Sequence, residues 1–257
     1  MAIKKADIHC HILPGIDDGA KNTEVSLELL REHRNQGVEK VIFTPHFNSD
    51  KISVEEFSAK RAQSAELLTS MKEFKDIGIE YKLGAEIYYT INLGELDLSN
   101  LCFSGSDYVL VELPTQARPH GMKRTFGNMI RNGYIPIIAH VERYSYMLKN
   151  PNELYDLIDL GCLAHINAEA LIQKTKATSM ICYFVRHGLV HFMCSDCHSR
   201  HRRPPNLKQG FEEMRSLLGD KYADRFLSNA NDVFNAQTIN PEINNLKKPK
   251  NMFGVWI

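Results

Sequence analysis

Histidine and carboxylate side chains recur at the ends of short apolar runs along this sequence, which has 11 histidines. The candidates are His9, His11, Asp18, His46, Glu86, Glu112, His140, Asp196 and His198, with Asp17 as an alternative to Asp18. Burying so many ionisable groups together is unfavourable unless cations neutralise them. Imidazole and carboxylate ligands with almost no thiolate suit Mn, Fe or Zn. We therefore predict a metal centre of two or three ions, with a carboxylate such as Glu86 as a bridge.

Two arginines stand close to these candidate ligands and extend the predicted chemistry to phosphate. Arg143 is three residues past His140, and Arg203 lies in the loop after Asp196 and His198. Guanidinium groups bind the non-bridging oxygens of phosphate, although a surface salt bridge is the alternative role for either arginine. A multinuclear centre activates water and neutralises charge in an in-line displacement at phosphorus. The residues together indicate metal-dependent phosphate ester hydrolysis.

Seven short apolar runs, rich in β-branched or aromatic residues, must position these groups. They predict buried parallel strands at Ala6–His9, Lys40–Thr44, Tyr81–Glu86, Tyr108–Leu113, Ile135–His140, Cys162–Ile166 and Val190–Cys194. Alternation of strands with amphipathic stretches favours a single α/β barrel, in which the carboxyl ends of the strands meet at one face. A doubly wound open sheet is the competing architecture. No GxGxxG motif follows the first strand, so nothing supports dinucleotide binding.

Helical patterns fill the segments between these runs. One follows Asn22 and stops at Gly37, and another starts with capping-box spacing at Ser53 and extends as one long helix to near Gly78. Further helices are expected at Pro151–Gly161, Ala168–Gly188 and Asn206–Leu218. We expect the barrel to occupy residues 1–240, followed by a basic and then aromatic tail over residues 241–257. Docking of Phe253 and Trp256 on the barrel, or binding of a partner, are the two roles considered for this tail.

Composition excludes several classes of protein. Lys plus Arg and Asp plus Glu are both 31, so the chain has no charge bias toward nucleic acid or an anionic membrane. The six cysteines are scattered and do not resemble a disulfide framework. No apolar run of about 18 residues is present to span a membrane, and the first residues lack the apolar stretch of a signal peptide. We expect a cytoplasmic protein with reduced thiols.

Five segments of the sequence carry a resemblance to a known family. They are DIHCHILPGIDDGAK, TPHF, GAEIYY, IAHVERY and SDCHSRHRRPP. These segments resemble motifs of the polymerase-and-histidinol-phosphatase (PHP) superfamily. More closely, they are similar to its bacterial manganese-dependent protein-tyrosine phosphatases from capsule and exopolysaccharide gene clusters. The likeness covers nearly the whole chain.

The resemblance implies a distorted α/β barrel that holds three metal ions, Mn²⁺ first and Fe or Zn as alternatives. The ligands that it implies are His9, His11, Asp18, His46, Glu86, Glu112, His140, Asp196 and His198. Arg143 and Arg203 would bind phosphate. The implied substrate is phosphotyrosine on the C-terminal tail of a membrane-linked tyrosine autokinase that controls polysaccharide export.

Rival functions can be separated by substrate and by mechanism. The same metal scaffold would also serve a histidinol-phosphate phosphatase, another small phosphomonoester phosphatase or an amidohydrolase. A non-catalytic binding protein would keep only a relic of the metal site. A cysteine-based mechanism is disfavoured, although Cys194 with Arg200 and Cys197 with Arg203 have suitable spacing. Neither match contains a glycine to cradle phosphate, and Asp196 within both would repel it. Cys10 is expected to point away from the metals.

Overall fold

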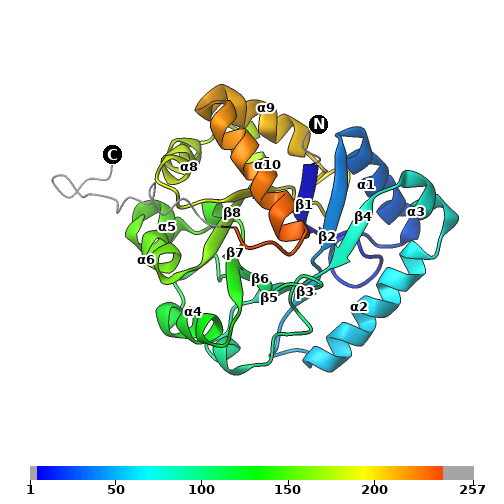
Figure 1. The fold of residues 1–257 in the computed structure, drawn as a ribbon, viewed down its shortest axis with the longest axis horizontal. Coiled ribbons are helices and arrows are strands. Elements are labelled where there is room, and N and C mark those ends of the chain that lie inside the picture. Colours follow the sequence, from blue (N-terminus) through cyan, green and yellow to red (C-terminus); the bar gives the residue numbers. More distant parts are fainter. Residues whose placement is uncertain (1–4, 240–257) are drawn as a thin grey trace.

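Short parallel strands form the centre of the computed structural model, which describes residues 5–239 (Figure 1). They are β1 (Lys5–Cys10), β2 (Val38–Phe43), β3 (His46–Phe47), β4 (Glu80–Leu83), β5 (Glu86–Tyr88), β6 (Tyr108–Glu112), β7 (Ile135–Ile138), β8 (Leu163–Asn167) and β9 (Phe192–Cys194). One set pairs in the order β1-β2-β4, and the other in the order β3-β5-β6-β7-β8-β9. All of these pairings are parallel.

The expected strand at Tyr81–Glu86 is interrupted, and so is the strand that precedes it. Pro45, which has no N–H to donate, separates β2 from β3. Gly84 separates β4 from β5, and a Cβ at this position would lie 2.5 Å from the ring of Phe103. Pairing nevertheless continues, because Gly84 N–H donates to Phe43 O (2.8 Å) and Glu86 N–H donates to Pro45 O (3.0 Å). The interruptions bend two neighbouring strands together, so the barrel is distorted without being opened.

The first and last strands close the barrel at the other side. Asp196 N–H donates to His9 O (3.0 Å), and His11 N–H donates to Cys197 O (2.9 Å). Cys10 and Cys197 form a parallel bridge between these two segments. The distorted α/β barrel predicted from the sequence is therefore confirmed, and a doubly wound open sheet is excluded.

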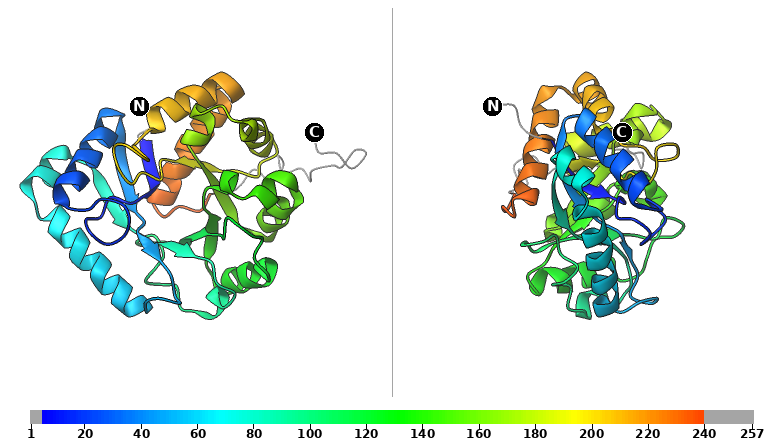
Figure 2. Two further views of the ribbon diagram at one scale, coloured as in Figure 1. Left: turned by 180° about the vertical axis from the view of Figure 1, so that it is seen from behind. Right: turned by 90° about the vertical axis from the view of Figure 1, so that its right-hand side faces the viewer.

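Helices surround the barrel on the outside (Figures 1 and 2). They are α1 (Thr23–Asn35), α2 (Val54–Thr69), α3 (Lys72–Ile77), α4 (Met122–Arg131), α5 (Ser145–Lys149), α6 (Asn152–Leu160), α7 (Glu169–Ile172), α8 (Lys176–Arg186), α9 (Leu207–Leu218) and α10 (Asp220–Phe234), with 3-10 turns at Leu93–Glu95 and Val141–Arg143. The predicted cap at Ser53 is present, because its hydroxyl accepts from Glu56 N–H at 3.1 Å. None of these helices is both long and apolar enough to cross a membrane.

Two of the expected helices are wrong in their extent. The helix expected from Ser53 to Gly78 is divided into α2 and α3 between Thr69 and Lys72, although Gly78 does end α3 in the left-handed conformation. The helix expected over residues 168–188 is divided into α7 and α8, with Lys174 at φ +48 between them. The sequence interpretation also missed α4 and α10. The tail prediction falls on residues outside the described range.

Side chains of the barrel interior are separate from those that pack under the outer helices. The interior group includes Ile8, Leu110, Ile137 and Phe192, together with Ala230, Val233 and Phe234 of α10. Figure 1 shows α10 crossing the barrel, and the side view of Figure 2 places it at one end. This helix closes the end at which the strands begin. The end at which they finish carries the polar residues described next.

Candidate metal centre

The structure brings together all eleven site residues predicted from the sequence. Most of them lie at, or just past, the carboxyl ends of the strands. In β1 an irregularity in register between Asp7 and Cys10 interrupts the regular alternation of sides. His9 and His11 contact the same two carboxylates, whereas Cys10 packs into the outer core. The predicted orientation of all three residues agrees with this arrangement.

The first group of atoms consists of two imidazole nitrogens and two carboxylate oxygens. His9 Nε2 and His11 Nε2 are 3.1 Å apart. Glu86 Oε2 lies 3.3 Å from the first nitrogen and 3.2 Å from the second. Asp196 Oδ1 lies 3.5 Å from both. All four side chains are buried. Donor atoms around a cation at a distance of about 2.1 Å are roughly 3.0–3.5 Å apart, so these spacings match the edges of a coordination polyhedron.

The hydrogen bonds behind these two rings determine where their protons lie. His140 N–H donates to His165 Nε2 (3.4 Å), so His165 Nε2 is an acceptor. His9 Nδ1, which is 2.8 Å from the same atom, must then carry the proton. His11 Nδ1 donates to the carboxylate of Asp17 at 2.8 Å. Because a neutral imidazole carries one proton, both Nε2 atoms present a lone pair to the first group.

When both rings are neutral, as metal ligation requires, four electron-rich atoms face one another. Glu86 Oε2 is buried and has no hydrogen-bond partner among the described residues. Burial alone would raise the pKa of Glu86, but His9, His11, His140 and His46 hold it well below its usual range. Burial likewise opposes a charge on His11, yet Asp17 and Glu86 raise its pKa well above the ordinary value, so the His11 Nε2 atom binds either a proton or a cation at this position. The cluster attracts positive charge, and its donor set fits a divalent cation.

A second group surrounds the other side of Glu86. His140 Nε2 lies 2.9 Å from Glu86 Oε1 and 3.6 Å from Glu112 Oε1. His46 Nδ1 lies 3.0 Å from Glu86 Oε2. Ligand atoms of His46, Glu86 and Glu112 all lie within 4.8 Å of one another. Burial and the charge of Glu86 raise the pKa of Glu112. Glu86 thus contributes atoms to both groups, which is the arrangement expected of a bridging carboxylate.

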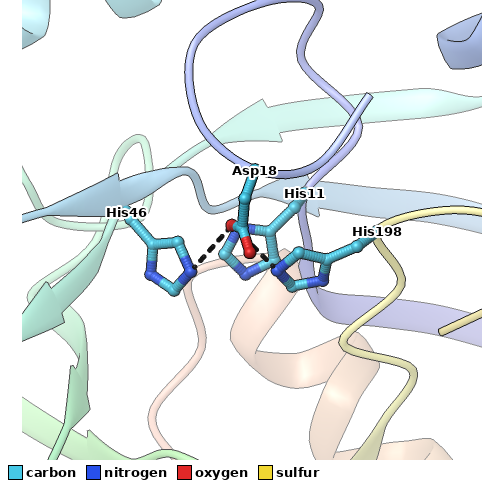
Figure 3. Close-up of side chains that lie close together, drawn as sticks. All are labelled: His11, Asp18, His46 and His198. Atoms are coloured by element: carbon cyan, nitrogen blue, oxygen red, sulfur yellow. Dashed lines mark ion pairs between the residues drawn. The ribbon is translucent and has the colours of Figure 1, made fainter. Parts of the chain in front are cut away.

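A third group lies nearer the surface and is drawn in Figure 3. Asp18 Oδ1 is 3.3 Å from His46 Nε2 and 3.4 Å from His198 Nε2, with the ring of His11 between the two histidines. His198 Nδ1 donates to the backbone carbonyl of Asp196 (2.8 Å), so its Nε2 presents a lone pair. That nitrogen is buried and has no hydrogen-bond partner among the described residues. Burial and His11 lower the pKa of His198 to about 2.

Asp17 and Asp18, which the sequence could not separate, occupy different positions. Both oxygens of Asp17 are occupied: Oδ2 accepts from His11 Nδ1 (2.8 Å) and His46 N–H (3.1 Å), and Oδ1 accepts from Gly19 N–H (2.9 Å). The side chain of Asp18 is 64% exposed and faces His46 instead. Gly19 allows this loop to lie against the first strand, because a Cβ there would be 2.1 Å from His11 O. This geometry favours Asp18 as the ligand and Asp17 as the residue that orients His11.

The two predicted arginines lie together beside Asp196. Arg143 Nη2 is 3.0 Å from Asp196 Oδ2, and Arg203 Nη1 is 3.2 Å from the same oxygen. Arg203 Nη2 also lies 3.5 Å from Asp18 Oδ2. Both side chains are partly exposed, at 33% and 26%. Burial lowers the pKa of Arg143, but Asp196 and Glu142 outweigh this effect and raise it. Each guanidinium has further N–H donors that do not contact Asp196. These donors lie next to the candidate metal positions.

Several supporting residues were not identified from the sequence. Asp7 Oδ2 accepts from His33 Nε2 (2.9 Å) and from the Ser195 hydroxyl, which ties the first strand to α1 and to the last strand segment. The Tyr144 hydroxyl lies 3.3 Å from His140 Nδ1. The only sequence signal for Asp7 was a carboxylate inside an apolar run. No local pattern distinguishes Tyr144 from a core tyrosine, since its role depends on packing.

Two of the candidate ligands have backbone conformations that are rare for residues with a side chain. His140 has φ +29 and Asp196 has φ +50. Such conformations are unfavourable by themselves and concentrate at functional sites. Each residue lies two positions past the end of a strand, β7 or β9, where the chain must turn while its side chain still faces the centre.

Known proteins resemble this chain along nearly its whole length. A family model described as capsular polysaccharide synthesis, CpsB/CapC, matches residues 5–235. Tyrosine-protein phosphatase YwqE of Bacillus subtilis (strain 168) is 31% identical, over 97% of this chain and 99% of the relative. Tyrosine-protein phosphatase CpsB of Streptococcus pneumoniae is also 31% identical, over 91% of this chain and 99% of the relative.

Solved structures that are similar to this chain include one from the same two relatives. A chain from the crystal structures of YwqE and CpsB, described as unique metal-dependent tyrosine phosphatases, matches with a TM-score of 0.85 and 29% identity. The match covers 92% of this chain and 97% of that one. A chain of an archaeal ribonuclease P bound to mature tRNA matches with a TM-score of 0.58 at 14% identity, which shows a shared fold and nothing more.

Proposed function

The chain belongs to the CpsB/CapC family of capsular polysaccharide synthesis, and we propose that it is a metal-dependent phosphatase that hydrolyses phosphotyrosine on proteins. One observation carries the proposal beyond the family relationship. The Nε2 atoms of His9 and His11 face the carboxylates of Glu86 and Asp196 in a buried site, with two arginines beside it. This arrangement suits cations and, next to them, a phosphate group.

Three overlapping ligand groups support two or three ions. We assign His9, His11, Glu86 and Asp196 to the first, His46, Glu86, Glu112 and His140 to the second, and His11, Asp18, His46 and His198 to the third. Mn²⁺ is the proposed metal, with Fe and Zn as alternatives that the same donor types accept. When bound, these ions would supply an activated water as the nucleophile and neutralise charge on the phosphate.

The side chains of the protein would orient the ester for that attack. Arg143 and Arg203 approach the centre from one side, where each donates to Asp196 and retains further N–H groups. These groups would bind the non-bridging oxygens and stabilise charge on them in the transition state. The tyrosyl oxygen would leave from the side of the phosphorus atom that is opposite the attacking water. Because a phenol has a pKa of about 10, its departure requires less help from an acid than that of an alkyl alcohol, and we assign no general acid.

A covalent intermediate on cysteine is not part of the proposal. Cys194 and Cys197 are fully buried, with no exposed surface. Burial raises the pKa of Cys194 well above its ordinary value. Burial also opposes ionisation of Cys197, although Cys10 and His33 lower its pKa to about 6. The sulfur of Cys197 lies 3.9 Å from His33 Nε2 and packs into the outer core, so it cannot reach a phosphate bound beside Arg203.

The proposed protein substrate is a membrane-linked bacterial tyrosine kinase, dephosphorylated on its C-terminal tail in the cytoplasm. The family description places the chain in capsule synthesis, and the relatives are named as tyrosine-protein phosphatases. All six cysteines are free and buried, which is compatible with a reducing compartment.

Hydrolysis of a phosphotyrosine peptide during titration with a chelator tests this function. We expect activity to disappear on chelation and to return with Mn²⁺, and Cys194→Ser and Cys197→Ser to keep activity in proportion to their metal content. Full activity after complete metal removal, or inactivity of a serine variant that binds metal normally, would overturn the mechanism. Faster hydrolysis of histidinol phosphate than of the peptide would overturn the substrate.

A further inference from the structure

Tyr88, the exposed tyrosine at the end of β5, lies at the rim of the metal centre and is neither a candidate metal ligand nor a candidate phosphate-binding residue. Side chains alternate along this strand. Glu86 faces the centre, Ile87 is buried in the outer core, and Tyr88 returns to the side of Glu86. Its Cα is paired in register with that of Glu112, one of the candidate ligands. Tyr88 is therefore directed over the end of the barrel that holds the centre.

Two stacked tyrosines extend from the candidate ligand His140 toward the surface. Tyr144 contacts His140 through its hydroxyl, and the ring of Tyr146 stacks on Tyr144 with centroids 5.7 Å apart and an angle of 18°. Burial raises the pKa of Tyr146, and Glu153 and then Tyr88 add smaller increases, so Tyr88 lies within electrostatic range of the Tyr146 hydroxyl. Tyr144 is buried, Tyr146 is partly buried and Tyr88 is exposed.

Tyr88 is 37% exposed, which leaves its ring accessible. Among the described residues, the large exposed apolar side chains are Leu67, Tyr81, Tyr88, Ile91 and Leu160. Of these five, only Tyr88 comes from a strand that also supplies a candidate metal ligand. Aromatic pairs favour offset-stacked or edge-to-face arrangements and gain free energy beyond the area that they bury. An accessible ring beside a phosphate site suits a substrate whose phosphate is attached to another ring.

We propose that Tyr88 contacts the aromatic ring of the substrate and makes the site selective for aryl over alkyl phosphate monoesters. This inference rests on the proposed phosphatase function and names the residue that would distinguish phosphotyrosine from phosphoserine. Tyr88 would be a specificity determinant and not a catalytic group, because it binds the leaving group and takes no part in proton transfer.

Inhibition by two phosphonates, which cannot be hydrolysed, separates ring binding from chemistry. Phenylphosphonate carries a ring next to its anionic group, and methylphosphonate does not. With metal-loaded protein and a phosphotyrosine peptide as substrate, we expect Tyr88→Ala to weaken phenylphosphonate inhibition about three- to tenfold and to leave methylphosphonate inhibition unchanged. Tyr88→Phe should retain both, since the ring and not the hydroxyl makes the contact. Calorimetric titration with the same two compounds provides a readout that does not depend on turnover.

Tyr81→Ala is the matched control, because Tyr81 is 40% exposed on β4 and packs outward against Phe43 and Phe74. It should change neither inhibition constant. Equal weakening of both phosphonates by Tyr88→Ala, or no weakening of either, would overturn the proposal. A wild-type protein that binds phenylphosphonate but does not hydrolyse phosphotyrosine would instead refute the proposed function, so the two failures are distinguishable.

Discussion

Replacement of Asp17 and Asp18 by asparagine, one at a time, tests the division of roles between these neighbouring carboxylates. Asp17 holds His11 Nδ1 at 2.8 Å and also accepts from His46 N–H, whereas Asp18 faces His46 and His198. We expect Asp18→Asn to lose one metal ion per chain. Asp17→Asn should keep the number of ions and bind them more weakly.

The size of the Asp17 effect follows from the bonds that it makes. Hydrogen bonds to a charged group contribute about 1.5–3 kcal/mol, which corresponds to a change of roughly 10- to 150-fold in an equilibrium constant. Asparagine keeps a neutral acceptor, so the lower part of this range, about tenfold, is the expected loss of Mn²⁺ affinity. Loss of the charge also makes the His11 imidazole a weaker donor to the metal.

Equilibrium dialysis against graded free Mn²⁺, followed by elemental analysis, gives the number of ions and their affinity in one experiment. Asp50→Asn is the control, because Asp50 is exposed in a nearby loop. An Asp17→Asn protein that matches this control would refute the orienting role. If Asp17→Asn lost an ion and Asp18→Asn did not, the two assignments would have to be exchanged.

Three further predictions concern phosphate binding, acid stability and the distorted strands. Arg143→Ala and Arg203→Ala should each lower kcat/KM for a phosphotyrosine peptide by about tenfold or more with metal content intact, and loss of metal would contradict a phosphate-binding role. Burial lowers the pKa of His191 from 6.5 to about 3, so the unfolded chain binds a proton that the folded protein excludes. His191 alone should therefore lower the free energy of unfolding by about 2 kcal/mol from pH 7 to pH 5, and urea titrations at the two pH values should show a fall that is smaller by about this amount in His191→Asn than in the wild type. Gly84→Ala should destabilise the protein by about 1–3 kcal/mol in the same assay because its Cβ meets Phe103, and an unchanged midpoint would show that the ring moves aside.

Strand ends were predictable from the sequence because a parallel barrel imposes one rule on all of them. Side chains just past each apolar run must converge, so Glu86, Glu112 and His140 could be placed at one face without knowledge of any loop. The structure brings these residues together as predicted. Their role as metal ligands remains a prediction until metal binding is measured.

Interruptions and supporting contacts were not predictable, because they depend on residues distant in sequence. The apolar run around Gly84 reads as a continuous strand, and only contact with Phe103 shows why it is interrupted. His165 lies inside an apolar run, and its role in setting the proton of His9 requires both rings to be in place. The choice between Asp17 and Asp18 similarly depends on a loop folded back on the first strand.

Closure of the barrel by α10 also bears on how the protein is made. This helix lies at residues 220–234, yet it packs on interior side chains from β1 such as Ala6 and Ile8. The Tyr108 hydroxyl donates to Gln237 O (2.9 Å) and accepts from Ile239 N–H (3.0 Å). During synthesis, the apolar surface of the earlier strands therefore stays exposed to solvent until residues 220–234 have left the ribosomal exit tunnel. Truncation before residue 220 would leave a chain that chaperones retain and proteases remove.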